Sequence, residues 1–442
     1  MRRPTKLERI YAVLTVVFIG STRLANASGY ALIDQNASGA GNAYAGAAAV
    51  AEDASTIFFN PAGMSYLPNS QFVASGQAIK PTATFDNNNS KTIGSTNLRG
   101  GNGGDPGDWG FLPNFYYAKA VSDSIHLGLG VNSPFGLQTQ YENDWVGRYQ
   151  ALNSKLQTIN INPSLSFKAY DWLSLGAGIN IQYADTTLSN AIDQGTICYG
   201  KLGSASCNAL KLTPQNNDGN VSIKGDDWGV GYNLGVIFQP LETTRIGIAY
   251  RSRINYTLKG NASFSNIATL LASKFQNSAV TADFIAPDSV SSSIVHQLNS
   301  QWDLLGDVTW THWSLFKQLK VVNSTGAILN NQIENWQDTM RYSVGASYRY
   351  TEQLKLRVGS AYDQTPTTNT TRTARIPDNN RVWMSLGANY KLSPSSSFDA
   401  AYTHIFVDNA SINQGAGTAA GQLQGSYNSS IDIISFQYTH TF

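Results

Sequence analysis

Alternation between apolar and polar side chains is the strongest constraint in this sequence, and it is plainest at the carboxyl-terminal end. Every second position there is apolar, aromatic or His: Ile434, Phe436, Tyr438, His440 and Phe442. Because successive side chains of a strand point to opposite faces, this run predicts a strand with one apolar and one polar face. It fits both an ordinary antiparallel strand with one buried face and the closing strand of a transmembrane β-barrel.

The amino terminus favours the membrane alternative. Arg2, Arg3, Lys6 and Arg9 precede an apolar run over residues 10–20, and small residues follow at 25–27, where a signal peptidase would cleave. We therefore predict that residues 1–27 are a cleaved secretory signal peptide, whose apolar core is too short to span a bilayer as a helix. No later segment approaches the roughly 20 apolar residues of a membrane helix. The mature protein is predicted to be either a periplasmic soluble protein or a barrel.

The charge balance points away from nucleic acid. The predicted signal peptide holds five basic residues and one acidic residue, so the 30 basic and 29 acidic residues of the whole chain fall to 25 and 28, a formal net charge of −3. Only 13% of the residues are charged, whereas 39 are Gly and 22 are Tyr. Barrels use small residues toward the lumen and aromatic residues at the membrane interfaces, so this composition favours a barrel.

Fourteen alternating runs follow residue 69. They cover residues 70–84, 109–121, 125–137, 155–169, 172–187, 226–239, 244–259, 287–298, 301–313, 338–350, 354–364, 380–392, 396–408 and 429–442. Tight breaks alternate with long polar ones, near 85–108, 138–154, 188–225, 260–286, 314–337, 365–379 and 409–428. An even strand number with short turns on one side and long loops on the other is typical of outer-membrane barrels. Lys355 and Arg357 are predicted to face inward, which suits a wet lumen.

The segment over residues 28–69 does not alternate and is rich in Gly and Ala. A fourteen-stranded barrel leaves a lumen that strand side chains cannot fill. We therefore predict that residues 28–69 form a hatch that plugs the lumen of a barrel built from residues 70–442. The alternative is a periplasmic extension. The predicted fold class is all-β, a 14-stranded antiparallel transmembrane β-barrel with an amino-terminal hatch.

Several motifs resemble one family. The stretch 38–46, followed by Glu52-Asp53-Ala54 and Asn60-Pro61-Ala62, is similar to the hatch of the FadL family of outer-membrane transporters for long-chain fatty acids and other hydrophobic compounds. The likeness continues through residues 228–235, 244–252, 310–316 and 376–381 and spans the mature chain. The resemblance implies passive uptake, without a cofactor, in the outer membrane of a Gram-negative bacterium. The implied partners are a hydrophobic small molecule, the lipid bilayer and lipopolysaccharide, and the implied state is a monomer.

The third run carries Pro134, Phe135 and Gly136. Proline cannot donate a ladder hydrogen bond and glycine permits a bend, so the pair predicts a break in the barrel wall; the alternative is that Pro134 merely ends the strand. In the family this strand is kinked inward, beside the Asn-Pro-Ala of the hatch. By that resemblance Asn60, Pro61 and Ala62 lie against the gap, and Asn60 caps backbone groups left unpaired there. A sideways exit suits apolar cargo, since each methylene exposed to water forfeits about 0.8 kcal/mol.

Candidate substrate contacts come from the same resemblance. Tyr30 matches the aromatic residue that lies in the family's binding pocket. Weaker candidates are Phe58, Phe59, Trp313 and Phe316, and an apolar stretch of a long loop contributes Phe264, Leu270 and Leu271, with a short amphipathic helix over 267–272. One departure bears on the cargo: Asp185 stands where fatty-acid carriers place a basic residue, although Lys320 retains a second basic position. Uncharged cargo such as aromatic hydrocarbons is therefore an alternative.

Two cysteines, Cys198 and Cys207, lie in a polar stretch of a predicted exposed loop, and in an oxidising compartment a disulfide is expected. An enzyme is disfavoured, because the five His lie in neither a Gly-x-Ser-x-Gly elbow nor a His-Glu-x-x-His motif. A general porin is the other competing class, and the hatch argues against it. We also expect no metal site.

Overall fold

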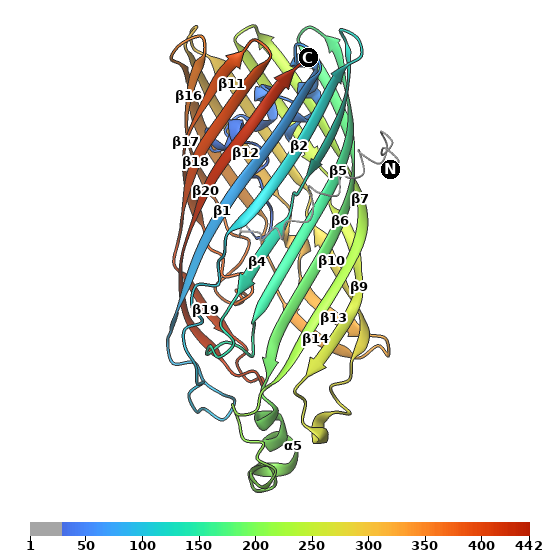
Figure 1. Cartoon of the computed structure of the whole chain (residues 1–442), viewed down its shortest axis with the longest axis vertical. Coiled ribbons are helices and arrows are strands. Elements are labelled where there is room, and N and C mark those ends of the chain that lie inside the picture. The colour runs from blue at the N-terminus through green and yellow to red at the C-terminus, as the bar shows by residue number, and fades with distance from the viewer. Residues whose placement is uncertain (1–28) are drawn as a thin grey trace, which may run out of the picture.

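A computed structural model of the chain shows a closed β-barrel around a short helical segment (Figure 1). The structure describes residues 29–442, so the predicted signal peptide lies outside the described residues. Three pairs of strands, β3 with β4, β8 with β9 and β10 with β11, are single barrel strands interrupted by two or three residues. The fourteen barrel strands are β1 (Gln71–Asn87), β2 (Gly110–Ala120), β3 (Ile125–Asn132) with β4 (Gly136–Gln140), β5 (Asn153–Tyr170), β6 (Leu173–Ile192), β7 (Gly219–Leu241), β8 (Thr244–Arg251) with β9 (Ile254–Ser265), β10 (Ser278–Ala286) with β11 (Ser289–Gln297), β12 (Trp302–Thr311), β15 (Thr339–Arg349), β16 (Leu354–Asp363), β17 (Arg381–Ser393), β18 (Ser396–Val407) and β20 (Leu423–Thr441).

The last strand closes the barrel against the first. β20 pairs antiparallel with β1 from Thr441 opposite Gln71 to Gly425 opposite Asn87. The alternation of β20 places Phe436, 63% exposed, on the outer surface and Ser435 inside. Exposed aromatic residues gather near the tight turns, among them Tyr170, Trp172, Phe238, Tyr350, Phe398 and Phe442. An apolar outer wall with an aromatic belt is the surface that a bilayer requires.

The two ends of the barrel differ. Tight turns join strands at the end where the carboxyl terminus lies, and long loops leave the opposite end, where α5 (Gln194–Ala209) projects beyond the wall (Figure 1). By the usual asymmetry of such barrels the turns face the periplasm and the loops face outside. The remaining loop elements are η2 (Thr269–Leu271), η3 (Trp313–Leu315), β13 (Gln318–Asn323), β14 (Ile328–Ile333) and β19 (Ala410–Gln414).

Three predicted loops are partly wrong, because the wall continues past the bilayer. β9 and β10 pair from Ile254 opposite Ala286 to Ala262 opposite Ser278, β13 pairs with β10 and β14, and β19 pairs with β20. These strands occupy much of 260–286, 314–337 and 409–428. Beyond the bilayer neither face of a strand needs continuous apolar side chains, so the alternation that predicts membrane strands fades there while backbone pairing continues.

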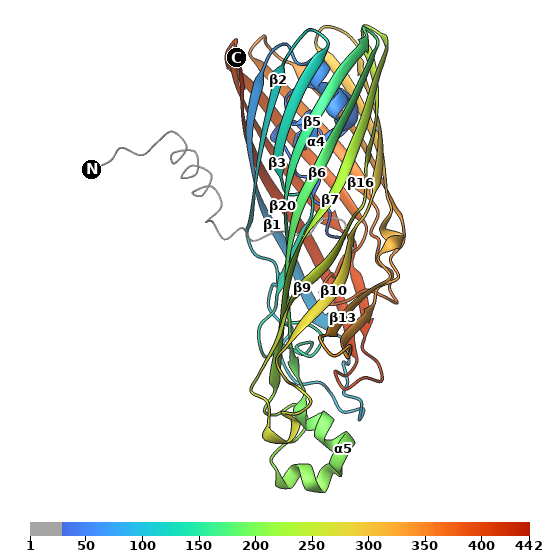
Figure 2. The ribbon, with the colours of Figure 1, turned by 90° about the vertical axis from the view of Figure 1, so that its right-hand side faces the viewer.

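Residues 29–69, hereafter the hatch, lie inside the barrel near the turn end (Figures 1 and 2). The hatch contains α2 (Ala37–Ala40), α3 (Ala47–Val50), α4 (Thr56–Phe59) and η1 (Pro61–Tyr66). Asn36 and Asn60 cap two of these helices, since their side-chain oxygens accept from Gly39 N and Ala62 N. Among residues 29–442 no helix is long and apolar enough to cross a membrane.

Candidate functional site

The hydrogen-bonded ladder of the wall is interrupted in the third barrel strand. β3 pairs with both β2 and β5, whereas β4 pairs with β5 alone among the described residues. Residues 133–135 separate the two halves, and residues 110–114 of β2 have their ladder partners in β1. The interruption lies at Pro134, which has no N–H to donate.

The first residues of the hatch cover this interruption. Leu32 N donates to Pro134 O at 2.8 Å, and Gly136 N donates to Tyr30 O at 2.8 Å, so that Ala31 lies opposite Phe135 as in an antiparallel pair. The hatch therefore supplies backbone partners that the neighbouring strand does not.

The prediction that Asn60 caps the break is wrong. Asn60 Nδ2 donates to Ala48 O at 2.7 Å and to Val236 O at 3.1 Å, and Asn60 Oδ1 accepts from Ala62 N. These contacts tie the Asn-Pro-Ala turn to α3 and β7 rather than to residues 133–135. The amide side chain thus fixes the hatch fold, and the backbone of residues 30–32 takes the position at the break.

An apolar cavity of about 90 Å³ lies on the loop side of Tyr30, hereafter the outer cavity. Its apolar walls come from Leu137, Leu156, Leu188, Ile223, Leu258, Val280, Phe284, Phe316, Leu319, Val321 and Ile376. Polar groups on its wall include Lys155, Lys224, Glu334 and Arg375. An apolar chain would find an apolar surface here with charged groups beside it.

Glu334 and Arg375 give the outer cavity its electrostatic character. Burial raises the pKa of Glu334 to about 8, although the Trp336 indole N–H, which donates to Glu334 Oε2 at 3.0 Å, and the charge of Arg375 both act in the opposite direction. Arg375 donates to neutral acceptors, Asn153 O at 3.0 Å and Ser154 Oγ at 3.0 Å. Burial therefore favours the neutral form of Glu334, and Arg375 is the positively charged partner in this wall.

Tyr30 separates the outer cavity from a second one. Its ring lies 4.5 Å from the ring of Trp313, 5.1 Å from Phe284 and 5.8 Å from Phe316, measured between centroids. The Tyr30 hydroxyl donates to Ile285 O at 2.8 Å. This aromatic cluster holds the start of the hatch in place between two apolar spaces.

The second space, hereafter the inner cavity, holds about 150 Å³ and adjoins the interruption in the wall. Pro134 and Phe135 line it from the third strand, and Leu32, Phe58 and Phe59 line it from the hatch. Both cavities are smaller than the roughly 300–1,000 Å³ of ordinary small-molecule sites. A long chain can occupy them only if the residues between them move.

The turn end of the lumen differs in character. A cavity of about 310 Å³ there is lined by charged groups, including Glu52, Arg245, Asp303 and Lys355. Phe59 lines this cavity as well as the inner cavity and so lies between them. Three cavities therefore follow one another along the barrel, and Tyr30 and Phe59 of the hatch separate them.

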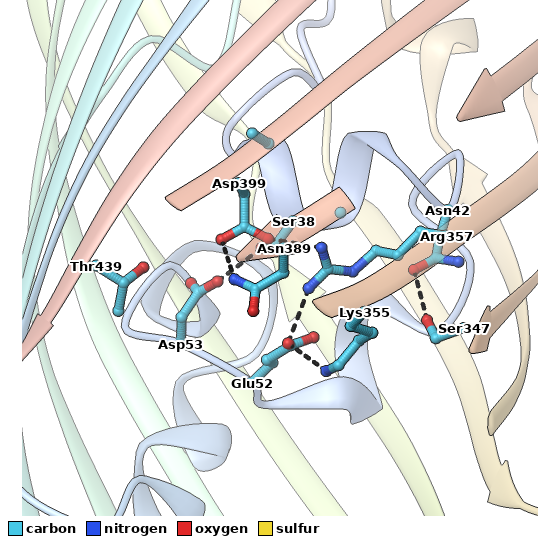
Figure 3. Close-up of polar contacts among 12 residues, drawn as sticks. Ser38, Asn42, Glu52, Asp53, Ser347, Lys355, Arg357, Asn389, Asp399 and Thr439 are labelled. Atoms are coloured by element: carbon cyan, nitrogen blue, oxygen red, sulfur yellow. Dashed lines mark hydrogen bonds and ion pairs between the residues drawn. The ribbon is translucent and has the colours of Figure 1, made fainter. Parts of the chain in front are cut away.

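Ion pairs fasten the hatch to the wall (Figure 3). Arg357 of β16 donates to Asp399 Oδ1 at 2.6 Å and to Glu52 Oε1 of the hatch at 2.8 Å, and Lys355 also pairs with Glu52. Burial would raise the pKa of the Glu52 carboxyl, but the charges of Arg357 and Lys355 outweigh burial and hold it well below its usual range. The inward direction predicted for Lys355 and Arg357 is thereby confirmed.

Several predicted contact residues lie away from both cavities. Lys320 is exposed, because Leu319 and Val321 on the alternate face of β13 line the outer cavity instead. Phe264 packs with Phe275 at 5.5 Å between centroids. Leu270 is exposed and Leu271 buried, in η2, where a short 3₁₀ turn replaces the predicted amphipathic helix.

Cys198 and Cys207 form a disulfide. The segment that carries them is helical, in α5, with a break at Gly203, whereas the sequence predicts a loop. Both cysteines are buried within α5. The bridge therefore joins the two arms of the projecting helix.

Sequence reasoning missed the buried charges. Glu334 and Arg375 lie in long connections that show no alternation, and Arg251 and Arg341, which line the inner cavity, stand in ordinary alternating runs. For Arg251 and Arg341, the sequence signal that could have found them was an arginine at an inward-facing position of a predicted strand. Among residues 29–442 no group of three or more His, Cys, Asp or Glu side chains is arranged to hold a metal ion.

A closed fourteen-stranded barrel with a lipid-facing surface, an internal hatch and apolar cavities in series defines an outer-membrane β-barrel of the transport class. Residues 18–442 match the family described as outer membrane protein transport protein (OMPP1/FadL/TodX), and the chain belongs to this family. It is therefore a FadL-family outer-membrane transporter of hydrophobic compounds.

Similar proteins span nearly the whole chain. The outer membrane protein NMB0088 of Neisseria meningitidis is 31% identical over 469 residues, covering 99% of each chain. The long-chain fatty acid transport protein of Escherichia coli is 28% identical over 426 residues, covering 91% of this chain and 93% of its own. The crystal structure of a Pseudomonas aeruginosa FadL homologue covers 94% of this chain and 100% of its own, with 27% identity and a TM-score of 0.85.

Proposed function

We propose that this protein carries long-chain fatty acids passively across the outer membrane, by a hatch-gated pathway that ends in a sideways exit through the break in the third strand. One observation carries the proposal: residues 30–32 separate the two apolar cavities and also pair with the break at Pro134 and Gly136. Movement of this one segment would join the cavities and uncover the wall beside β2.

The free energy of an apolar chain favours this exit. Continuing along the lumen past Phe59 would place the chain in the charged cavity at the turn end, beside Glu52 and Lys355. Each methylene exposed to water there forfeits about 0.8 kcal/mol. A sideways step into the bilayer avoids that loss, so the break is the favourable route for this cargo.

Cations beside the outer cavity favour a carboxylate on the cargo. Within residues 29–442 Arg375 donates only to neutral acceptors, Lys155 and Lys224 line the same cavity, and the raised pKa of Glu334 favours its neutral form. Similarity to the long-chain fatty acid transport protein supports the same cargo. We propose that the transporter acts as a monomer and takes up cargo at the lipopolysaccharide-bearing surface.

Uncharged hydrophobic compounds, such as aromatic hydrocarbons, are the second candidate cargo. Asp185 precedes Thr186, which lines the outer cavity, and so adds a negative charge next to its wall, while the exposed Lys320 does not line the cavity. A binding panel of oleate, a fatty alcohol and toluene separates the two: fatty-acid transport predicts clear preference for oleate, and equal binding of all three would favour the second cargo.

Liposomes holding the purified protein test the transport proposal. We expect uptake of oleate without swelling by small sugars, whereas sugar flux would indicate a general porin. Pro134→Val combined with Gly136→Val should favour regular strand pairing, close the sideways exit and stop uptake. Pro163→Val, in the neighbouring β5, is the matched proline control. Undiminished uptake by the double variant would rule out the sideways exit.

A further inference from the structure

A cation without a carboxylate partner borders the inner cavity. Arg251, the last residue of β8, donates from Nη1 to Asn180 Oδ1 at 2.7 Å and from Nη2 to Phe58 O at 2.8 Å. Its guanidinium carbon also lies 4.2 Å from the centroid of the Phe58 ring. In the part of the chain that the structure describes, Arg251 forms no ion pair. Keeping a charge away from bulk water without a counter-ion costs free energy. That cost suggests that Arg251 has a function in this position.

Neutral amides hold this arginine in position. Asn180 Nδ2 donates to Asn233 Oδ1 at 3.2 Å, and Asn160 Nδ2 donates to Asn180 Oδ1 at 3.0 Å. The network continues to Asn162, which also donates to Asn233. These amides fix the direction of the Arg251 guanidinium without cancelling its charge, so its attraction for an anion in the cavity is preserved.

A second arginine lines the same cavity. Arg341 of β15 is 6% exposed and donates from Nη2 to Ala43 O at 2.8 Å, and its Nε has no hydrogen-bond partner among the described residues. Asp363 is the carboxylate on this wall, and it forms no ion pair with either arginine within the described chain. The charges of Asp34, Asp307 and Asp363 all act on Arg341, so Arg251 is the cation of this cavity that lacks a carboxylate partner among the described residues.

We propose that the inner cavity is a second cargo site, selective for an amphipathic molecule with an anionic carboxylate head group. Arg251 takes the carboxylate, and Leu32, Phe58 and Phe135 contact the alkyl chain. A guanidinium matches a carboxylate in shape as well as in charge. The proposal rests on the proposed function, because cargo reaches this cavity only past Tyr30.

The site would select cargo beside the exit. An uncharged hydrocarbon gains nothing from Arg251, whereas a fatty acid held there has its chain next to Pro134 and Phe135. The inner cavity therefore distinguishes fatty acids from hydrocarbons of similar length after both have entered the outer cavity.

Photolabelling locates the cargo and tests this assignment. Oleate and oleyl alcohol, each carrying a diazirine near the head group, are incubated with the full-length protein in liposomes, and the labelled residues are mapped by mass spectrometry. We expect the acid to label peptides holding Phe58 and Phe135, and Arg251→Met to lower that labelling by about tenfold. Labelling by the alcohol should stay within about twofold.

Matched variants keep the test decisive. Arg245→Met removes the same charge from the same strand, at the turn-end cavity, and should leave inner-cavity labelling unchanged. If Arg251→Met does not assemble, labelling of Arg251→Lys, which keeps the charge, is compared with labelling of Arg251→Gln, which removes it. Equal labelling by the acid in charged and neutral variants would overturn the inner site. Absence of labelling at Phe284 and Phe316 in the outer cavity would instead overturn the proposed function.

Discussion

Gly359 of β16 lies against the hatch backbone at Asn42: a Cβ at this glycine would stand 2.1 Å from the Asn42 carbonyl carbon. Gly247 of β8 has the same relationship with Ala48, whose carbonyl oxygen would lie 1.9 Å from an added Cβ. Backbone cannot move aside as a flexible side chain can. Gly359 in β16 and Gly247 in β8 therefore allow the hatch backbone to pack closely against two separate strands of the barrel wall.

Gly359→Ala should push the hatch away from the wall. We expect a loss of about 1–3 kcal/mol in hatch docking, seen as greater permeability to small sugars in liposome swelling. Gly306→Ala in β12 is the control, because a Cβ there meets Ile294 at 3.4 Å, an ordinary contact. Identical sugar permeability in the two variants would show that close packing at Gly359 does not hold the hatch.

Arg357→Met should release the hatch by a different route. The substitution leaves Asp399 buried without its cation and removes one of the two partners of Glu52, so we expect a loss of about 3–5 kcal/mol in the free energy of unfolding, measured with guanidinium in detergent. Lys355→Met breaks a more exposed pair and should cost under about 1 kcal/mol. Equal effects of the two substitutions would contradict the role given to Arg357.

The pKa of Glu334 predicts how binding depends on pH. Burial raises this pKa from 4.5 to about 8, so the carboxyl is neutral below that pH and negatively charged above it. Octyl sulfonate stays anionic at both pH values. It should bind roughly fivefold more weakly at pH 9 than at pH 7. Glu334→Gln should bind it equally at both values. A pH dependence that persists in the Gln variant would contradict this assignment.

The same shift has a consequence for stability. An acid whose pKa is higher in the folded protein favours folding while it is protonated, and its ionisation opposes folding. The free energy of unfolding should therefore fall as pH rises from about 4.5 through about 8, and Glu334→Gln should remove that part of the fall.

Alternation predicted the wall, because a strand between lipid and water must alternate. The predicted inward direction of Arg357 follows from that rule alone, whereas the pairing of the last strand with the first also depends on closure of a barrel with an even number of strands. The rule fails where both faces of a strand meet water, which is why β13 and β14 were expected to be a loop. Lys320 was placed in the site by family resemblance, whereas its neighbours Leu319 and Val321 line the outer cavity.

The contacts between hatch and wall could not be predicted. Family resemblance placed Asn60 at the strand break, where its side chain was expected to cap backbone groups, but the backbone of residues 30–32 supplies these hydrogen bonds instead. Which of the two reaches Pro134 depends on the path of the hatch through the lumen. No local pattern in the sequence encodes that path.

A reversible cross-link across the break tests the central claim most directly. Ala31 and Phe135 face each other between two backbone hydrogen bonds, a position where Cα atoms of antiparallel strands lie about 4.5 Å apart and a disulfide fits. Ala31→Cys with Phe135→Cys should lock residues 30–32 over the break when oxidised. The single variants and the unsubstituted protein, each with and without reductant, control for the bridge between Cys198 and Cys207. We predict that oleate uptake into liposomes stops in the oxidised double variant and returns on reduction; full uptake with the bridge verified by mass spectrometry would contradict the account.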